Sequence, residues 1–112
     1  MSDCLFCKMV AGEIKPDTVF ENDRILAFKD INPQAQIHIL IIPKIHIATL
    51  NEMDEAGLGG EILMTAAKLA KQLDIADSGY RTVFNCNANG GQAVYHLHLH
   101  LLGGRQMGWP PG

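Results

Sequence analysis

The hydrophobic positions of this chain mostly form short runs bounded by turn residues, which is typical of β-strands. The run IHILIIP, residues 37–43, is β-branched and nearly all apolar, so it predicts a central strand that Pro43 ends. The pattern predicts four further strands, over residues 17–23, 24–30, 80–87 and 93–102. We expect turns over residues 21–23 and 31–36 and a loop over residues 88–92.

Between Asp54 and about Leu73 the apolar positions recur with a helical period. They share one face, at Leu58, Ile62, Ala66, Leu69 and Leu73. Glycines at 57, 59 and 60 weaken the first turn by up to ~1 kcal/mol each. A short helix is expected over residues 4–12, where Gly12 ends it. This order of elements, with short connections, predicts one α+β domain over residues 1–112: a five-stranded antiparallel sheet with one long and one short helix.

The composition narrows the possible partners and compartment. The 112 residues are 47% hydrophobic and 19% charged, as in an ordinary globular domain. A net charge of −3 and scattered basic residues argue against a nucleic-acid partner. No apolar run approaches the roughly 20 residues of a membrane helix, and the first residues do not resemble a signal peptide, so we expect a cytoplasmic protein. Three cysteines are too few for a disulfide framework, and Cys86 is expected to be a small buried residue.

Three histidines, His96, His98 and His100, alternate with leucines in VYHLHLHLLGG. Side chains alternate along a strand, so the histidines should share one face while the leucines face the long helix. A merely polar face is one explanation, but it gives no reason for three histidines. A metal site is a second, although the outer rings would lie roughly 13 Å apart, so two neighbours can share an ion but all three hardly can. Catalysis on a phosphate is the third, because imidazole can act as nucleophile, proton donor and cation.

The loop before these histidines favours the phosphate. Gly90 and Gly91 in NANGGQA allow the backbone to approach an oxyanion and to point N–H groups at it. Taken alone, a Gly-Gly pair more often marks a plain turn. Followed directly by three histidines in register, it predicts a phosphate-binding loop.

HLHLHLL matches the histidine triad pattern, in which three histidines alternate with apolar residues, and the chain resembles the Hint branch of that family. The resemblance extends to FKDINPQAQIHILIIPKIHI, GYRTVFN, GGQAVYHLHLHLLGGRQM and the closing WPPG. It implies the HIT-like fold, with the sheet continued edge to edge across a homodimer. It also implies that the tail, residues 104–112, lies near the partner's site, where Trp109 can touch the leaving group. A frayed terminus is the alternative.

The activity that the resemblance implies is that of a purine nucleoside phosphoramidase, which hydrolyses the P–N bond of an AMP-amine conjugate and needs no organic cofactor. His98 would form a nucleotidyl-histidine intermediate and His100 would stabilise negative charge on the phosphate. His96 and His38 would complete the proton network. Two alternatives stay open: a dinucleoside polyphosphate hydrolase or nucleotidyl transferase of a sibling branch, and a purine-nucleotide-binding interaction protein without catalysis.

The same resemblance assigns a set of residues to nucleotide binding: Phe6, Phe28, Asp30, Ile31, Asn85, Gly91, Gln92, Ala93, His98 and His100. Asp30 would grip the ribose hydroxyls, and N–H groups from Gly91 to Ala93 would bind the phosphate. The plainer alternatives are core packing for Phe6 and Phe28 and turn capping for Asp30. Ala93 departs from the serine that is common in Hint-like chains, so we expect an altered rate or affinity without loss of activity.

The pair Cys4 and Cys7 has the Cys-x-x-Cys spacing of a metal or redox site. Two thiolates are half of a zinc site, and the alternative is two free thiols. Bacterial-type family members that the chain resembles add two histidines, at the positions of His46 and His96, so the resemblance implies structural zinc. If zinc takes His96, that ring cannot serve the proton network through the same nitrogen.

Overall fold

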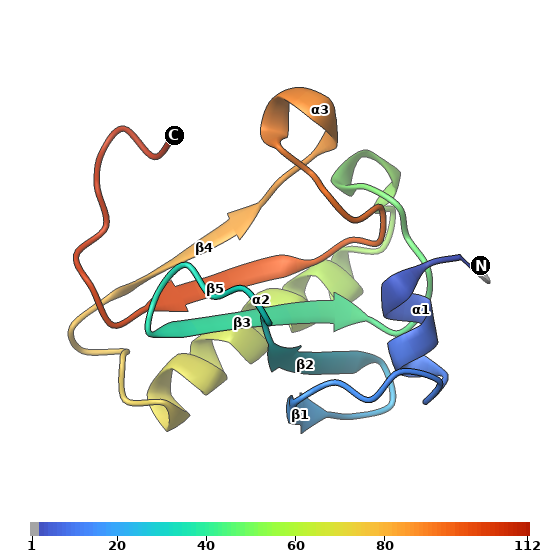
Figure 1. Ribbon diagram of the computed structural model, residues 1–112, viewed down its shortest axis with the longest axis horizontal. Helices are drawn as coiled ribbons and strands as arrows, with labels where there is room; N and C mark the ends of the chain where they lie inside the picture. The colour runs from blue at the N-terminus through green and yellow to red at the C-terminus, as the bar shows by residue number, and fades with distance from the viewer. Residues whose placement is uncertain (1–2) are drawn as a thin grey trace.

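The computed structural model describes residues 3–112, so the first two residues of the predicted domain 1–112 lie outside the described residues. The elements follow in the order α1 (Leu5–Val10), β1 (Thr18–Glu21), β2 (Ile25–Lys29), β3 (Ile37–Pro43), a short 3-10 turn η1 (Leu50–Glu52), α2 (Ala56–Gln72), β4 (Tyr80–Phe84), α3 (Asn87–Gly90) and β5 (Leu99–Gly103) (Figure 1). The predicted α+β class, the five strands and the long helix are confirmed. Within the described residues no helix has both the length and the apolar character needed to cross a bilayer.

The five strands form one antiparallel sheet in the order β1-β2-β3-β5-β4. The strand β5 therefore inserts between β3 and β4, and Leu40 pairs with His100 across the β3–β5 ladder. This pairing places the end of the histidine motif in the middle of the sheet. The tail after β5 runs beyond the β4 edge of the sheet (Figure 1).

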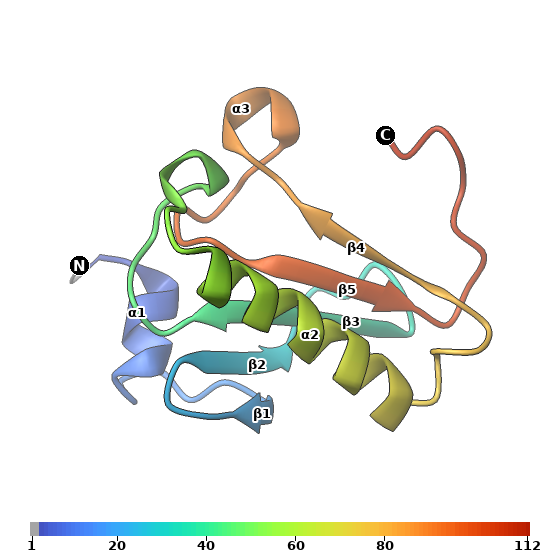
Figure 2. The same cartoon turned by 180° about the vertical axis from the view of Figure 1, so that it is seen from behind.

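Opposite faces of the sheet pack into two separate clusters. The helix α2 crosses one face (Figure 2), where Leu99 and Leu101 pack with Leu58, Ile62 and Leu69 of the helix. The other face holds a smaller cluster under α1, formed by Phe6, Leu26, Phe28, Leu40 and Ile42. The leucines of the motif thus face the long helix, as their alternation predicts.

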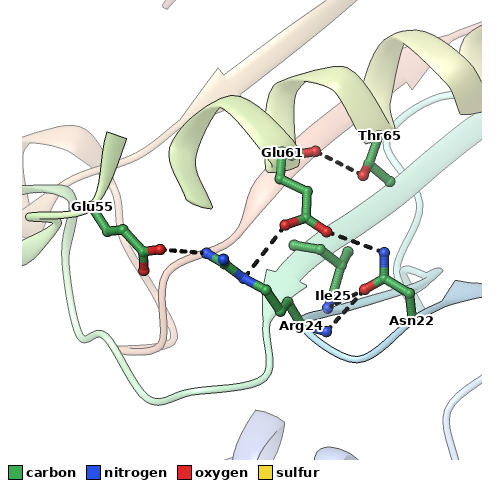
Figure 3. A network of polar contacts seen from close by, with 6 residues as sticks. All are labelled: Asn22, Arg24, Ile25, Glu55, Glu61 and Thr65. Atoms are coloured by element: carbon green, nitrogen blue, oxygen red, sulfur yellow. Dashed lines mark hydrogen bonds and ion pairs between the residues drawn. The ribbon is translucent and has the colours of Figure 1, made fainter. Parts of the chain in front are cut away.

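Polar contacts hold the β1–β2 turn against α2 (Figure 3). The side-chain oxygen of Asn22, Oδ1, accepts from the backbone N–H groups of Arg24 and Ile25, both at 2.9 Å, which closes the turn. The Asn22 amide and the Arg24 guanidinium both reach Glu61 on the helix, at 3.1 and 3.4 Å. Arg24 also pairs with Glu55 at 2.9 Å, just before α2 begins. The hairpin and the helix are therefore joined outside the apolar core as well as through it.

The last predicted strand was too long at its beginning. Residues 93–98 are not part of the ladder, and β5 starts at Leu99. The physical reason is that this segment finds partners outside the sheet: the Leu97 N–H donates to the Ile47 carbonyl at 2.6 Å. The predicted loop 88–92 likewise contains most of the one-turn helix α3, which Gly91 ends with a φ of 79°. Cys86 is half-buried, not buried, because it lies at the surface turn before α3.

Candidate active site

A cavity of about 550 Å³ opens on the sheet face opposite α2. Of the residues predicted to bind the nucleotide, those that line it are Phe6, Phe28, Asp30, Ile31, Ala93, His98 and His100. Residues that the sequence reasoning missed also line it, among them Leu5, Met9, Ile14, Leu40 and Val94. Two sequence signals pointed to some of these. Leu5 and Met9 are four residues apart on α1, and Leu40 is two residues from His38 on β3.

His98 is oriented by the backbone of the triad itself. Its Nδ1 lies 2.8 Å from the His96 carbonyl oxygen. A carbonyl oxygen only accepts hydrogen bonds, so Nδ1 of His98 must carry the ring hydrogen and Nε2 keeps a lone pair. The ring is 8% exposed, and its burial lowers the pKa of His98 below its usual value. The result is a neutral imidazole, with a nucleophilic nitrogen, in the wall of the cavity.

A series of hydrogen bonds through His38 determines which nitrogen of His100 carries the ring hydrogen. The Gln34 N–H donates to Nδ1 of His38 at 3.0 Å, so the hydrogen of His38 is on Nε2. That Nε2–H donates to Nδ1 of His100 at 2.9 Å, which leaves the hydrogen of His100 on its own Nε2. Burial first, and then the neighbouring His98 and His38, lower the pKa of His100 to about 4. His100 therefore offers the cavity a neutral N–H donor.

Asp30 lies beside this series of hydrogen bonds. Its Oδ1 accepts from the Asn32 N–H at 2.8 Å, as the turn-capping alternative expects. Its Oδ2 lies 3.4 Å from Nε2 of His38. Burial lowers the pKa of His38, and the Asp30 carboxylate partly opposes that effect. The carboxylate both caps the turn after β2 and lines the cavity.

The aromatic residues of the wall are part of the core and of the site together. Phe6 and Phe28, each almost fully buried, meet edge to face with centroids 5.4 Å apart. Phe6 also stands edge-on to His98 at 5.2 Å. Ile31, in contrast, is 97% exposed at the rim, and half-buried Asn85 is not among the residues that line the cavity.

The glycine loop offers fewer N–H groups than its sequence suggests. The N–H of Gly91 donates to the Ala88 carbonyl at 3.0 Å, and the N–H of Gln92 donates to the Asn87 carbonyl at 3.1 Å. Both donors are therefore used to close the α3 turn. Among residues 3–112 no partner is found for the N–H of Ala93, which lines the cavity. Within the described residues, the N–H of Ala93 is thus available to an anion.

The four predicted metal ligands come together beside the cavity. The ligand atoms of Cys4, Cys7, His46 and His96 all lie within 4.8 Å of one another. Nδ1 of His96 lies 3.4 Å from the Cys4 sulfur and 3.5 Å from the Cys7 sulfur, and Nδ1 of His46 lies 3.3 Å from the Cys7 sulfur. Tetrahedral bonds of ~2.3 Å to sulfur and ~2.0–2.1 Å to nitrogen would separate such atoms by roughly 3.5 Å. The donor set and spacing therefore fit zinc.

The His96 ring faces the Cys4–Cys7–His46 group and not His98. Its Nε2 lies 2.8 Å from the Pro43 carbonyl oxygen, which assigns the hydrogen to Nε2 and leaves the Nδ1 lone pair directed at the thiols. The contribution of His96 to His98 is its carbonyl oxygen. The contact with the thiols and the contact with His98 thus involve different atoms of His96.

Comparison with known proteins identifies the family of this chain. A family model described as the HIT domain matches residues 11–107. The purine nucleoside phosphoramidase of Escherichia coli (strain K12) is 49% identical over 109 residues, 95% of this chain and 91% of that protein. The adenylylsulfatase HINT1 of Arabidopsis thaliana is 46% identical over 115 residues, 99% of this chain and 78% of that protein.

Solved structures give the same result. The crystal structure of a HIT family hydrolase from Legionella pneumophila Philadelphia 1 aligns with a TM-score of 0.95 and 58% identity, covering 98% of this chain and 100% of that one. A HIT family hydrolase from Clostridium thermocellum aligns with a TM-score of 0.93 and 46% identity, covering 96% of both chains. These matches show that the chain belongs to the histidine triad family, in its Hint branch.

Proposed function

We propose that this protein is a hydrolase that cleaves the P–N bond of purine nucleoside 5′-phosphoramidates, releasing a nucleoside monophosphate and an amine. The observation that carries the proposal is the state of His98, whose Nδ1–H is held by the His96 carbonyl while its Nε2 remains a lone pair in the cavity wall. A neutral nucleophile beside a neutral N–H donor, His100, suits attack on an anionic phosphorus. The relatives named above supply independent support.

The reaction takes two steps. Nε2 of His98 attacks the α-phosphorus, the P–N bond breaks, and the amine leaves with a proton taken up from solvent water. Water then attacks the nucleotidyl-histidine, which releases the monophosphate, returns a proton to the solvent and restores neutral His98. Two displacements at phosphorus replace one difficult displacement. Nε2–H of His100 and the N–H of Ala93 stabilise the charge that grows on the phosphoryl oxygens.

The rest of the cavity holds the nucleoside. Phe6 and Phe28 present apolar surface to the purine, with Ile31 at the rim, and Asp30 accepts from the ribose hydroxyls. Asn85 does not line the cavity, and its contact with the ribose-phosphate stays a proposal. His38 holds the tautomer of His100 and does not touch the phosphorus. Gly91 and Gln92 contribute by shaping the loop that presents Ala93.

Zinc at Cys4, Cys7, His46 and His96 is proposed as structural, because the four ligands leave no open position for substrate. When bound, it would join α1 to the segment after β3 and to the triad. Protein purified without chelator should carry about one zinc per chain; less than about 0.2 equivalents contradicts a structural site.

The chain is further proposed to form a homodimer through β4. This strand ends the sheet order, so its outer edge offers unpaired backbone groups to a second copy. The tail would then reach the partner's site, and Trp109, 82% exposed, is available to contact a leaving group. Size-exclusion chromatography with light scattering should give twice the chain mass, and a species with the mass of one chain contradicts the dimer.

The decisive experiment compares the wild type with His98→Asn on a fluorogenic adenosine phosphoramidate. Turnover should fall by at least ~10³-fold, while AMP affinity stays close to that of the wild type. Intact-mass analysis of quenched wild-type reactions should show one added nucleotidyl group, which the variant lacks. A surface substitution on α2, Lys71→Asn, serves as the control. Unchanged turnover in His98→Asn ends the assignment, and testing adenylyl sulfate in parallel separates P–N from P–O cleavage.

A further inference from the structure

Gln92 is a polar residue in the phosphate loop whose side chain is turned into the protein. It is 8% exposed and, unlike its neighbour Ala93, does not line the cavity. Its Oε1 accepts from the Asn87 N–H at 2.9 Å. Its Nε2 donates to the Ala48 carbonyl at 2.8 Å and to the Val94 carbonyl at 3.1 Å. The amide oxygen thus faces a donor and the amide nitrogen faces two acceptors, so all three contacts agree on one orientation.

These three bonds join the two ends of the loop to a fixed support. Asn87 is the first residue of α3, and Val94 follows the residue whose N–H is available to phosphate. Ala48 belongs to the backbone after His46, and the adjacent carbonyl of Ile47 accepts from the Leu97 N–H at 2.6 Å. Gln92 and Leu97 therefore both form hydrogen bonds to residues 47–48, and Ala93 lies between these two bonded residues in the chain.

Methionine has a similar length but cannot make these bonds. With methionine at 92, the carbonyls of Ala48 and Val94 and the N–H of Asn87 would lose their buried partner, which favours opening of the loop to water. The turn bonds of Gly91 and Gln92 alone would then hold the loop. Within the described residues, none of the hydrogen bonds of the Gln92 side chain involves Phe28 or Asp30, at the proposed base and ribose end of the cavity.

We infer that Gln92 is a positioning residue, whose side-chain amide aims the Ala93 N–H at the phosphate without touching the nucleotide. The inference deepens the proposed function and rests on it for the identity of the ligand. Substituting Gln92 should weaken the binding of nucleotides and leave the binding of nucleosides unchanged, since a nucleoside has no phosphate for the loop to bind.

The experiment compares Gln92→Met with the wild type and with Gln72→Met, a matched change on the exposed end of α2. AMP and adenosine affinities are measured by calorimetry, kcat and KM are measured on the phosphoramidate, and amide hydrogen exchange is followed across residues 87–97. If Gln92→Met does not fold, Gln92→Asn replaces it, because the same amide on a shorter stem cannot reach all three partners.

The expected result is an AMP affinity reduced by ~10-fold or more, as for the loss of one hydrogen bond to a charged group. Adenosine affinity should stay within about twofold, and the amides of Gly91 and Gln92 should exchange faster. Equal weakening of AMP and adenosine indicates a general structural role and overturns the inference. So does weaker AMP binding with unchanged exchange, which indicates direct contact. A wild-type chain that binds no AMP overturns the proposed function, and equal exchange in both chains then also overturns the loop-ordering role of Gln92.

Discussion

Acidification should destabilise this fold, and the part of the stability loss that is due to His100 can be measured separately. The pKa of His100 is lowered from 6.5 to about 4 by burial and by the neighbouring His98 and His38. Between these values the unfolded chain binds more protons than the native chain, so the free energy of unfolding falls as the pH falls. This contribution is complete above pH 6.5 and is lost towards pH 4. From this one side chain, linkage gives a loss of about 2 kcal/mol at about pH 5 and about 3 kcal/mol below pH 4.

The assay is urea unfolding of the wild type and of His100→Gln, at about pH 7.5 and about pH 5, with the metal removed from both. The wild type should lose about 2 kcal/mol more than the variant between the two conditions. Since His38, His96 and His98 are present in both chains, their effects largely cancel in the difference. A histidine added on the surface, Gln72→His, should produce no extra loss. Equal losses in the wild type and His100→Gln would refute the reasoning that burial keeps His100 neutral.

Two further predictions concern the N-terminal metal group and the packing of β5. Cys7→Ser should abolish zinc binding, lower the Tm and weaken the binding of AMP and of adenosine alike, because Cys7 is next to Phe6 on α1. Cys86→Ser is the control. An unchanged zinc content in Cys7→Ser would contradict the site. Gly103→Ala should lower the free energy of unfolding in urea by about 1–3 kcal/mol, because a Cβ there would lie 2.5 Å from Cδ1 of Ile75. Gly108→Ala is the control and should be neutral, because a Cβ there would have nothing within 4 Å. Equal stability of the two alanine variants would show that Ile75 gives way freely.

Much of the architecture was predicted from local patterns because those patterns are physically local. A strand alternates its side chains and a helix repeats every 3.6 residues, so the apolar positions fixed the long helix and the two faces of the histidine motif. The family motif then assigned the metal ligands and the triad by position. The lengths of β5 and of the loop before it were wrong, since both depend on where residues 93–98 find hydrogen-bond partners.

The tertiary structure alone decided how the histidines differ. His38 and His100 are 62 residues apart in the chain, and Cys4 and His96 are 92 apart, so no local period relates them. The sequence determined that three imidazoles would alternate with leucines that face α2, although only His100 of the three lies within β5. Which nitrogen of each ring carries a hydrogen, and whether that ring meets a thiol, a carbonyl or the cavity, depends on partners that the β3–β5 pairing and α1 bring close. A side-chain pattern can set the direction in which a group points, whereas its proton and its chemistry are set by what it meets in three dimensions.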